Sequence, residues 1–132
     1  MSTTYMSDLG SIASDPQGGG SWWLAVGRGL DALMDRLSRD ELVDEGPRGD
    51  VTEAVWTAPF LAPRASKLHR QRQALTERAR SLRRRLAVSA GDPSEVRFYA
   101  EELAELAREE DQYRRRSRDL VWDSVTQDIG GE

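Results

Sequence analysis

The sequence predicts an all-α fold: a long antiparallel helical hairpin of coiled-coil type, preceded by an amphipathic helix and a flexible N-terminal tail. Three observations support this prediction. Leucine and alanine recur at spacings of three and four residues over 66–126, which is the period of one helix face. A Gly-Asp-Pro turn signal at 91–93 interrupts this pattern once. No segment shows the alternation of apolar and polar residues that predicts a half-buried strand.

The N-terminal third of the chain contains two kinds of sequence. Residues 1–21 are rich in serine, glycine and threonine and end in a glycine run followed by serine, so we expect a flexible tail. Residues 22–43 carry apolar side chains every three or four positions, which predicts an amphipathic helix that packs on another surface. These side chains are Trp23, Val26, Leu30, Leu33 and Leu37.

Two segments flank the predicted hairpin. Residues 44–65 contain prolines and glycines that break the helical period, together with the apolar run AVWTAPFLAP. We therefore expect an apolar linker that lies against another part of the protein. Residues 127–132 are expected to form a C-terminal tail.

The hairpin itself is predicted over 66–126. Gly91 suits the left-handed residue that ends the first helix. Asp92 as the N-cap, Pro93 at the first helical position and Glu95 then favour the start of the second helix. Folding about Gly91 places leucines of one helix opposite alanines of the other, so that the side chains interdigitate.

Charge is segregated into blocks that the hairpin brings together. Residues 64–85 carry nine basic side chains and one acidic one, whereas 94–111 carry seven acidic side chains and two arginines. The polar layer of the seam places Arg72 opposite Glu110, and this pair is predicted to fix the register of the two helices. Much of the basic block is then neutralised by the chain itself.

Charge also predicts neighbours beside the seam. Arg78 is expected near Glu105, Arg80 near Glu101 and Glu102, and Arg70 near Asp111. The second hairpin helix outruns the first and carries the basic stretch 114–118 beside apolar residues. Because the amphipathic helix is acidic and has an unpaired apolar face, we expect it to dock there, either within one chain or in a neighbouring subunit.

Composition excludes several functional classes. The chain of 132 residues has a formal charge of −4, which disfavours non-specific nucleic-acid binding by the whole molecule. It has no cysteine, so thiolate metal sites and disulfides are excluded. His69 is the only histidine, with no catalytic partner at a recognisable spacing, and no phosphate-binding loop is present. We therefore expect no enzyme activity, no cofactor and no metal.

Location and source are predicted from similar features. The N-terminus lacks a secretion signal, and no apolar run reaches the length of a membrane span. A cytoplasmic location is therefore expected. Eighteen arginines against one lysine indicate a GC-rich coding bias, and a bacterial source is expected.

Aromatic residues outside the hairpin seam indicate a protein interface, because tryptophan is enriched at binding hot spots. A small satellite core is the other role that such residues would fill. The predicted interface residues are Trp22, Trp23, Leu30, Trp56, Phe60 and Trp122. The main functional prediction is a non-enzymatic helical adaptor or structural subunit that docks into a larger assembly, with a protein partner or by self-assembly.

Clustered arginines support an alternative from a different class. Guanidinium groups match phosphates, so a regulator that binds nucleic acid, a nucleotide messenger or the transcription machinery is the rival prediction. The candidate anion-binding residues are Arg83, Arg84, Arg85, Arg114, Arg115 and Arg116. Glu77, Ser81 and Arg84 have the spacing E-x3-S-x2-R, which resembles part of the motif in actinobacterial anti-sigma factors that bind cyclic di-GMP. This chain has Val88 where that family has a glutamine.

A second resemblance rests on the segment SWWLAVGRGLD and on the later helix that follows Gly-Asp-Pro. With Val96, Tyr99, Leu103 and Leu106 behind the proline, these features resemble the needle and inner-rod subunits of type III secretion systems. Those subunits are helical hairpins that polymerise, so the resemblance implies a polymerising subunit as a second alternative. This chain is longer, has a Pro-rich middle, and has arginines where that family has a polar stretch.

Overall fold

The computed structural model describes residues 4–45 and 49–130, with side chains over 9–42 and 49–126. All regular structure in these residues is helical, which confirms the predicted all-α class. The elements are α1 (Thr4–Ser14), α2 (Gly20–Glu45), α3 (Asp50–Thr57), η1 (Pro59–Leu61), α4 (Ala62–Ser89), η2 (Pro93–Glu95) and α5 (Val96–Gly130). No helix in this part of the chain is long and apolar enough to cross a membrane.

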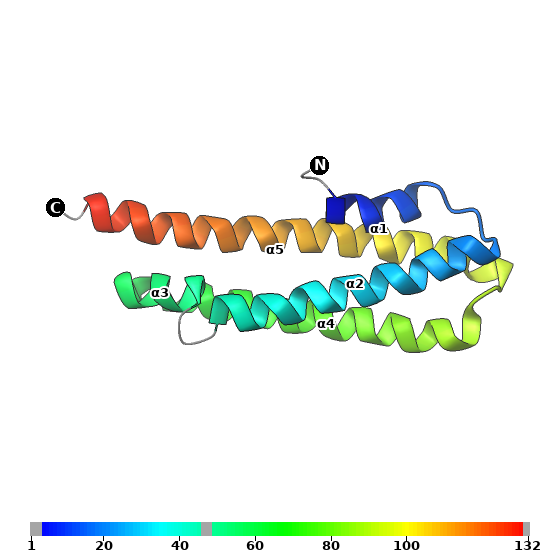
Figure 1. The fold of residues 1–132 in the computed structure, drawn as a ribbon, viewed down its shortest axis with the longest axis horizontal. Helices are drawn as coiled ribbons and strands as arrows, with labels where there is room; N and C mark the ends of the chain where they lie inside the picture. The colour runs from blue at the N-terminus through cyan, green and yellow to red at the C-terminus, as the bar shows by residue number, and fades with distance from the viewer. Residues whose placement is uncertain (1–3, 46–48, 131–132) are drawn as a thin grey trace.

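Three long helices form an elongated bundle (Figure 1). α4 and α5 are joined by a tight turn and run antiparallel, as predicted, and α2 packs along α4. α1 packs on α5 and α2 over the half of the bundle that holds the turn, hereafter the turn end. α3 packs on α5 at the opposite end, which also holds η1, the start of α4 and the C-terminal part of α5. This opposite end is hereafter the far end.

The turn between α4 and α5 has the local structure that the sequence predicts. Gly91 adopts a φ of +89°, a conformation that residues with a Cβ rarely take. The Asp92 carboxylate accepts a hydrogen bond from the backbone N–H of Ser94 at 3.0 Å, which confirms its capping role. The capped segment is η2, so α5 itself begins at Val96.

The core follows the predicted hairpin seam and extends it to a third helix. Its buried residues on α4 are Leu68, Leu75, Ala79, Leu82 and Leu86. Those on α5 are Tyr99, Leu103, Leu106, Ala107, Tyr113 and Leu120. The apolar face of α2 supplies Val26, Leu30, Leu33 and Leu37, which are buried at 0–1% exposure. The predicted amphipathic helix therefore finds its partner surface within the same chain.

Residues 4–14 form α1, which corrects the predicted flexible tail. Leu9 is fully buried, and Ile12 packs against the core. Gly29 on α2 permits this approach, because a Cβ there would stand 3.1 Å from Leu9 Cδ2 and 3.2 Å from Ile12 Cδ1. The indole N–H of Trp22 also donates to the backbone carbonyl of Ile12 at 3.0 Å. The few apolar residues of this segment are therefore sufficient to pack it on the bundle as a helix, although its average composition is polar.

The predicted linker also contains helices, α3 and η1, which corrects its irregular assignment; residues 46–48 lie outside the described residues. Its apolar residues pack on the bundle, as their composition predicted. The buried ones are Val51, Ala54, Ala58 and Leu61. α3 packs on the overhang of α5, where the amphipathic helix was expected. The amphipathic helix reaches the start of the basic stretch, where Asp40 pairs with Arg114 at 2.7 Å, as the charges predicted.

The boundaries of the long helices also differ from the prediction. α4 begins at Ala62, because a proline such as Pro63 is tolerated in the first turn of a helix. α5 continues to Gly130, through most of the segment expected to be a C-terminal tail. The overhang of α5 beyond α4 is consequently shorter than predicted.

Candidate protein interface

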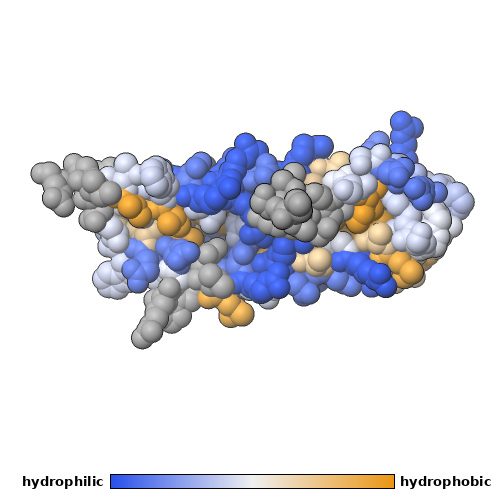
Figure 2. Space-filling model, turned by 45° about the horizontal axis from the view of Figure 1, so that its top comes forward, coloured by the Kyte–Doolittle hydropathy of each residue, from blue (hydrophilic) through white to orange (hydrophobic). Residues whose placement is uncertain are grey.

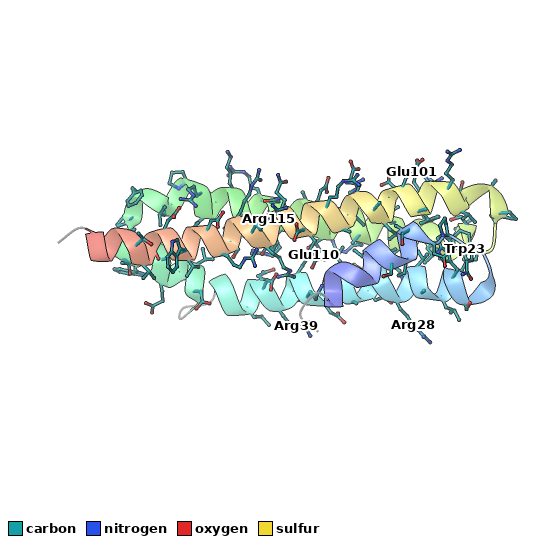
Figure 3. The ribbon with its side chains drawn as sticks, turned by 90° about the horizontal axis from the view of Figure 1, so that it is seen from above. Trp23, Arg28, Arg39, Glu101, Glu110 and Arg115 are labelled. Atoms are coloured by element: carbon teal, nitrogen blue, oxygen red, sulfur yellow. The ribbon has the colours of Figure 1, made fainter. Side chains whose placement is uncertain are left out.

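The predicted interface residues separate into a buried set and an exposed set. Trp22, Trp23 and Leu30 are buried, with 6%, 6% and 0% of their surface exposed. Trp23 lies at the turn end, edge-on to Tyr99 with 5.4 Å between ring centroids (Figure 3). These three residues belong to the core, which corrects their assignment to an interface. α2 needs an apolar face of its own to join the hairpin as a third helix, and they form part of that face.

The exposed set lies at the far end. Trp56, Phe60 and Trp122 have 83%, 62% and 68% of their surface exposed. These three residues are hereafter the aromatic set. Large apolar side chains gathered at one end of a small protein are typical of a surface that another molecule covers.

Short elements and one ion pair position the aromatic set. Trp56 is near the end of α3, which packs on α5, and Phe60 lies in η1, between α3 and α4. Arg64 in the first turn of α4 donates to Asp123 at 2.7 Å. Because Asp123 follows Trp122 directly, this pair joins the start of α4 to the part of α5 that carries the third aromatic residue.

Two of the grooves at the far end are lined in part by a residue of the aromatic set. One lies between α3 and α4, has a volume of about 480 Å³, and is lined by Val55, Trp56, Ala65 and His69 among others. The second lies between α5 and two residues of neighbouring helices, Asp40 of α2 and Asp50 of α3; it has a volume of about 510 Å³ and includes Trp122 in its lining. They are hereafter the α3–α4 groove and the α5 groove. Figure 2 shows apolar residues in orange at this end, beside a band of hydrophilic residues over the middle.

A buried layer of charged residues separates the far end from the turn end. Glu110 on α5 has 1% of its surface exposed and points toward α2 (Figure 3). Arg36 on α2 donates to both of its carboxylate oxygens, from Nε at 2.9 Å and from Nη2 at 2.8 Å. Arg114 donates to the same carboxylate at 3.0 Å and to Asp40 of α2 at 2.7 Å. The layer therefore joins α2 to α5 through side chains.

The predicted register pair belongs to this layer. Arg72 on α4 is buried, as Glu110 is, and its Nη2 lies 2.8 Å from Nδ1 of His69. The direct pairing of Arg72 with Glu110 stays a prediction. Arg36 of α2 and Arg114 of α5 both pair with Glu110. The prediction considered only the two hairpin helices, whereas the observed layer also includes α2.

Beside the seam, Arg78 is the centre of a partly buried cluster of charged residues. Its guanidinium donates to Glu109 at 3.0 Å, to Glu102 at 2.9 Å and also to Glu105. The predicted closeness of Arg78 and Glu105 is confirmed. Arg80 instead donates to Glu77 in its own helix, so its expected pairing with the acidic face of α5 is wrong. A partner one helical turn away, at i−3, is available to Arg80 without reaching across the hairpin.

The Arg78 cluster predicts how stability depends on pH. The hydrogen bond and the positive charge of Arg78 hold the pKa of Glu105 below its usual value. A lowered pKa in the folded state adds stability above the unfolded-state pKa of about 4.3, and this stability is lost as the pH falls through the folded pKa. The stability difference between wild type and Arg78→Met should therefore shrink as the pH is lowered from 7 to 3. Urea unfolding followed by circular dichroism measures it.

Arg97→Met is the matched control, because Arg97 is exposed and its single carboxylate contact, to Glu101, is 3.6 Å long. Its effect should be small and nearly independent of pH. A difference between wild type and Arg78→Met that stays constant down to pH 3 contradicts the assignment of the acid-sensitive stability to this cluster.

The predicted anion-binding arginines are dispersed rather than gathered. One group lies near the end of α4 and the other in the middle of α5. Four have carboxylate partners: Arg83 with Asp31, Arg85 with Glu95, Arg114 with Asp40 and Glu110, and Arg115 with Asp111. The other two contact neutral groups at 3.4 Å, Arg84 with Ser81 and Arg116 with Gln71. Most of these arginines are thus neutralised by carboxylates of the same chain.

Features expected for the other functional classes are reported for the described residues only. Among the side chains of residues 9–42 and 49–126, no group of three or more histidines, aspartates and glutamates is placed to hold a metal ion. The helical hairpin with an Asp-Pro turn is present, but α1, α2 and α3 also pack on it.

The fold defines the class of protein: an all-α bundle of three long helices covered by two short ones. No protein-family model, no curated protein and no solved structure matches the chain.

Proposed function

We propose that the protein is a non-enzymatic helical adaptor or structural subunit that docks into a larger protein assembly through its aromatic set. The exposure of Trp56, Phe60 and Trp122 at one end of the bundle is the observation that carries the proposal. The remaining two tryptophans are in the core, so the aromatic residues divide between folding and recognition.

The exposed surface area of the aromatic set is large enough to support this proposal. Each large aromatic side chain has about 150–250 Å² of surface, so the aromatic set leaves roughly 400 Å² exposed. Covering that area contributes about 10 kcal/mol of gross binding free energy at 25 cal/mol per Å². Because association costs about 4–15 kcal/mol in lost freedom, the aromatic set is a strong anchor that needs additional contacts around it.

The arginines support this function over the rival regulator. A surface that binds a nucleic-acid backbone needs cations available for phosphates. Four of the six candidate arginines have carboxylate partners in the folded chain. The exposed aromatic set has no comparable partner within the chain's described surface.

Affinity purification from the organism that encodes the chain tests the proposal. Wild type should retain a protein partner at a constant molar ratio, and the double variant Trp56→Ser, Phe60→Ser should lose it. Replacing the two aromatic side chains removes apolar contact from the α3–α4 groove and from η1, where hot-spot residues are expected. Quantitative mass spectrometry of the eluates measures the ratio, and the retained protein is then purified and its binding titrated.

Leu24→Ser is the matched control, because Leu24 is an exposed apolar residue on α2, near the turn end. It should leave the partner ratio unchanged. Equal retention by the double variant and the control, with both proteins folded, refutes docking through the aromatic set.

A further inference from the structure

The α5 groove is the open part of a longer groove, and α1 covers the other part. Seen from above, α1 lies between α2 and α5 over the turn end (Figure 3). Beyond the start of α1 the same side of the bundle holds the α5 groove. Its lining residues are Asp40, Asp50, Arg114, Ser117, Arg118, Val121, Trp122 and Val125. In this bundle, the groove along α5 is therefore covered by α1 at the turn end and open at the far end.

The open part has an apolar strip between charges of opposite sign. Trp122 is 68% exposed and Val125 is 48% exposed. Asp50 belongs to α3 and Arg118 to α5, so they come from opposite walls. In the described part of the chain neither Asp50 nor Arg118 has an ion pair or a side-chain hydrogen bond. Asp40 and Arg114, deeper along the same groove, are already paired at 2.7 Å.

We propose that a second copy of this chain occupies the α5 groove and forms a two-fold symmetric dimer. A two-fold interface requires that residue i of one copy meets residue j of the other, and the reverse. Asp50 and Arg118 meet this requirement, because they have opposite charges and no partner among the described residues. The inference rests on the proposed function, since it assigns one part of the same far end to self-association.

The charge arrangement also selects the orientation of the two copies. A two-fold axis parallel to the groove places the α3 wall of one copy over the α5 wall of the other, so Asp50 faces Arg118 twice. An axis across the groove places like walls together, so Asp50 faces Asp50. Opposite charges favour the first arrangement, in which the two bundles lie side by side with their far ends together.

Charge reversal at the two positions tests the dimer. Wild type is expected to be dimeric at roughly 100 μM, and Asp50→Arg or Arg118→Glu should each raise the dimer dissociation constant roughly tenfold or more, because each variant places two like-charged pairs in the interface. An equimolar mixture of the two variants should restore the dimer, because both charge pairs of the mixed dimer are again opposite. Sedimentation velocity measures all four samples.

Arg28→Glu is the matched control, since Arg28 is an exposed arginine on α2 outside the far end (Figure 3). It should leave the dissociation constant within roughly twofold of wild type. A monomeric wild type overturns the inference, and so does a dimer that both single variants retain. A mixture that stays monomeric overturns the Asp50–Arg118 pairing and the arrangement built on it.

The two experiments can refute the adaptor function and the dimer independently of each other. The purification experiment changes Trp56 and Phe60, which are not in the lining of the α5 groove. A monomeric protein whose partner is lost in the Trp56→Ser, Phe60→Ser variant keeps the adaptor function and loses only the dimer. A dimer that retains no other protein loses the adaptor and keeps the self-association.

Discussion

Glu110→Ala is expected to lower the free energy of unfolding by about 3–5 kcal/mol, the range found when one partner of a buried ion pair is removed. Glu110 is buried and accepts hydrogen bonds from Arg36 and Arg114. Its loss leaves these guanidinium groups, which are 11% and 19% exposed, with less compensating charge. Urea unfolding at pH 7, followed by circular dichroism at 222 nm, measures the change.

Glu101→Ala is the control for this variant, because Glu101 is an exposed glutamate of the same helix. Its effect should be below about 0.5 kcal/mol, as for other exposed ion pairs. If the two variants lose similar stability, the buried charged layer does not stabilise the junction between α2 and α5, and the α2–α5 contact must depend on the apolar residues alone.

Leu30→Ala is expected to lower the free energy of unfolding by about 2–5 kcal/mol, because it leaves a cavity in the core. Leu30 is fully buried on the face of α2 that packs on the hairpin. The sequence predicted this residue as part of an interface with another molecule. A large loss of stability in the isolated chain distinguishes a core residue from an interface residue, which tolerates truncation until its partner is added.

Leu24→Ala provides the comparison within the same helix, since the same change is made at an exposed position. Both substitutions change helix propensity equally, so the difference between them reports burial alone. Leu24→Ala should change stability by less than about 0.5 kcal/mol. Nearly equal losses for the two leucines would mean that α2 does not pack on the hairpin as described.

The hairpin could be predicted because its determinants are local in sequence. Gly91 and Asp92 fix the turn, and the leucine spacing fixes the faces of the two helices. Once the turn is placed, the pairing of Arg78 with Glu105 follows from counting outward from it. The side-chain hydrogen bond between these two residues shows that the register was predicted correctly on this face.

The short helices could not be predicted from composition, because their apolar residues are few. Leu9 and Ile12 stand three positions apart among serines and glycines, which is a short local signal for α1. Val51 and Ala54 have the same spacing within α3. Both helices are stabilised by the long helices they cover, and that contact becomes apparent only when the bundle is assembled.

Only part of the candidate interface could be predicted, because the exposure of its residues also depends on how the helices assemble. A tryptophan outside the hairpin seam can cover the core or face solvent, and the choice depends on which helix lies beside it. α2 places Trp22 and Trp23 against the turn end, whereas α3 covers α5 and leaves Trp122 exposed. Sequence reasoning also missed Asp50 as a wall of the α5 groove, because it assigned that segment to a linker.

The contact between Arg36 and Glu110 spans 74 positions of the chain, which has a consequence for synthesis on the ribosome. At about 5–20 residues per second, roughly 4 to 15 seconds separate the translation of the two residues. Until α4 has been translated, the nascent α2 has an apolar stripe of Leu30, Leu33 and Leu37 and no hairpin helix to pack on. The newly made N-terminal half is therefore expected to be a client of ribosome-associated chaperones until the hairpin emerges.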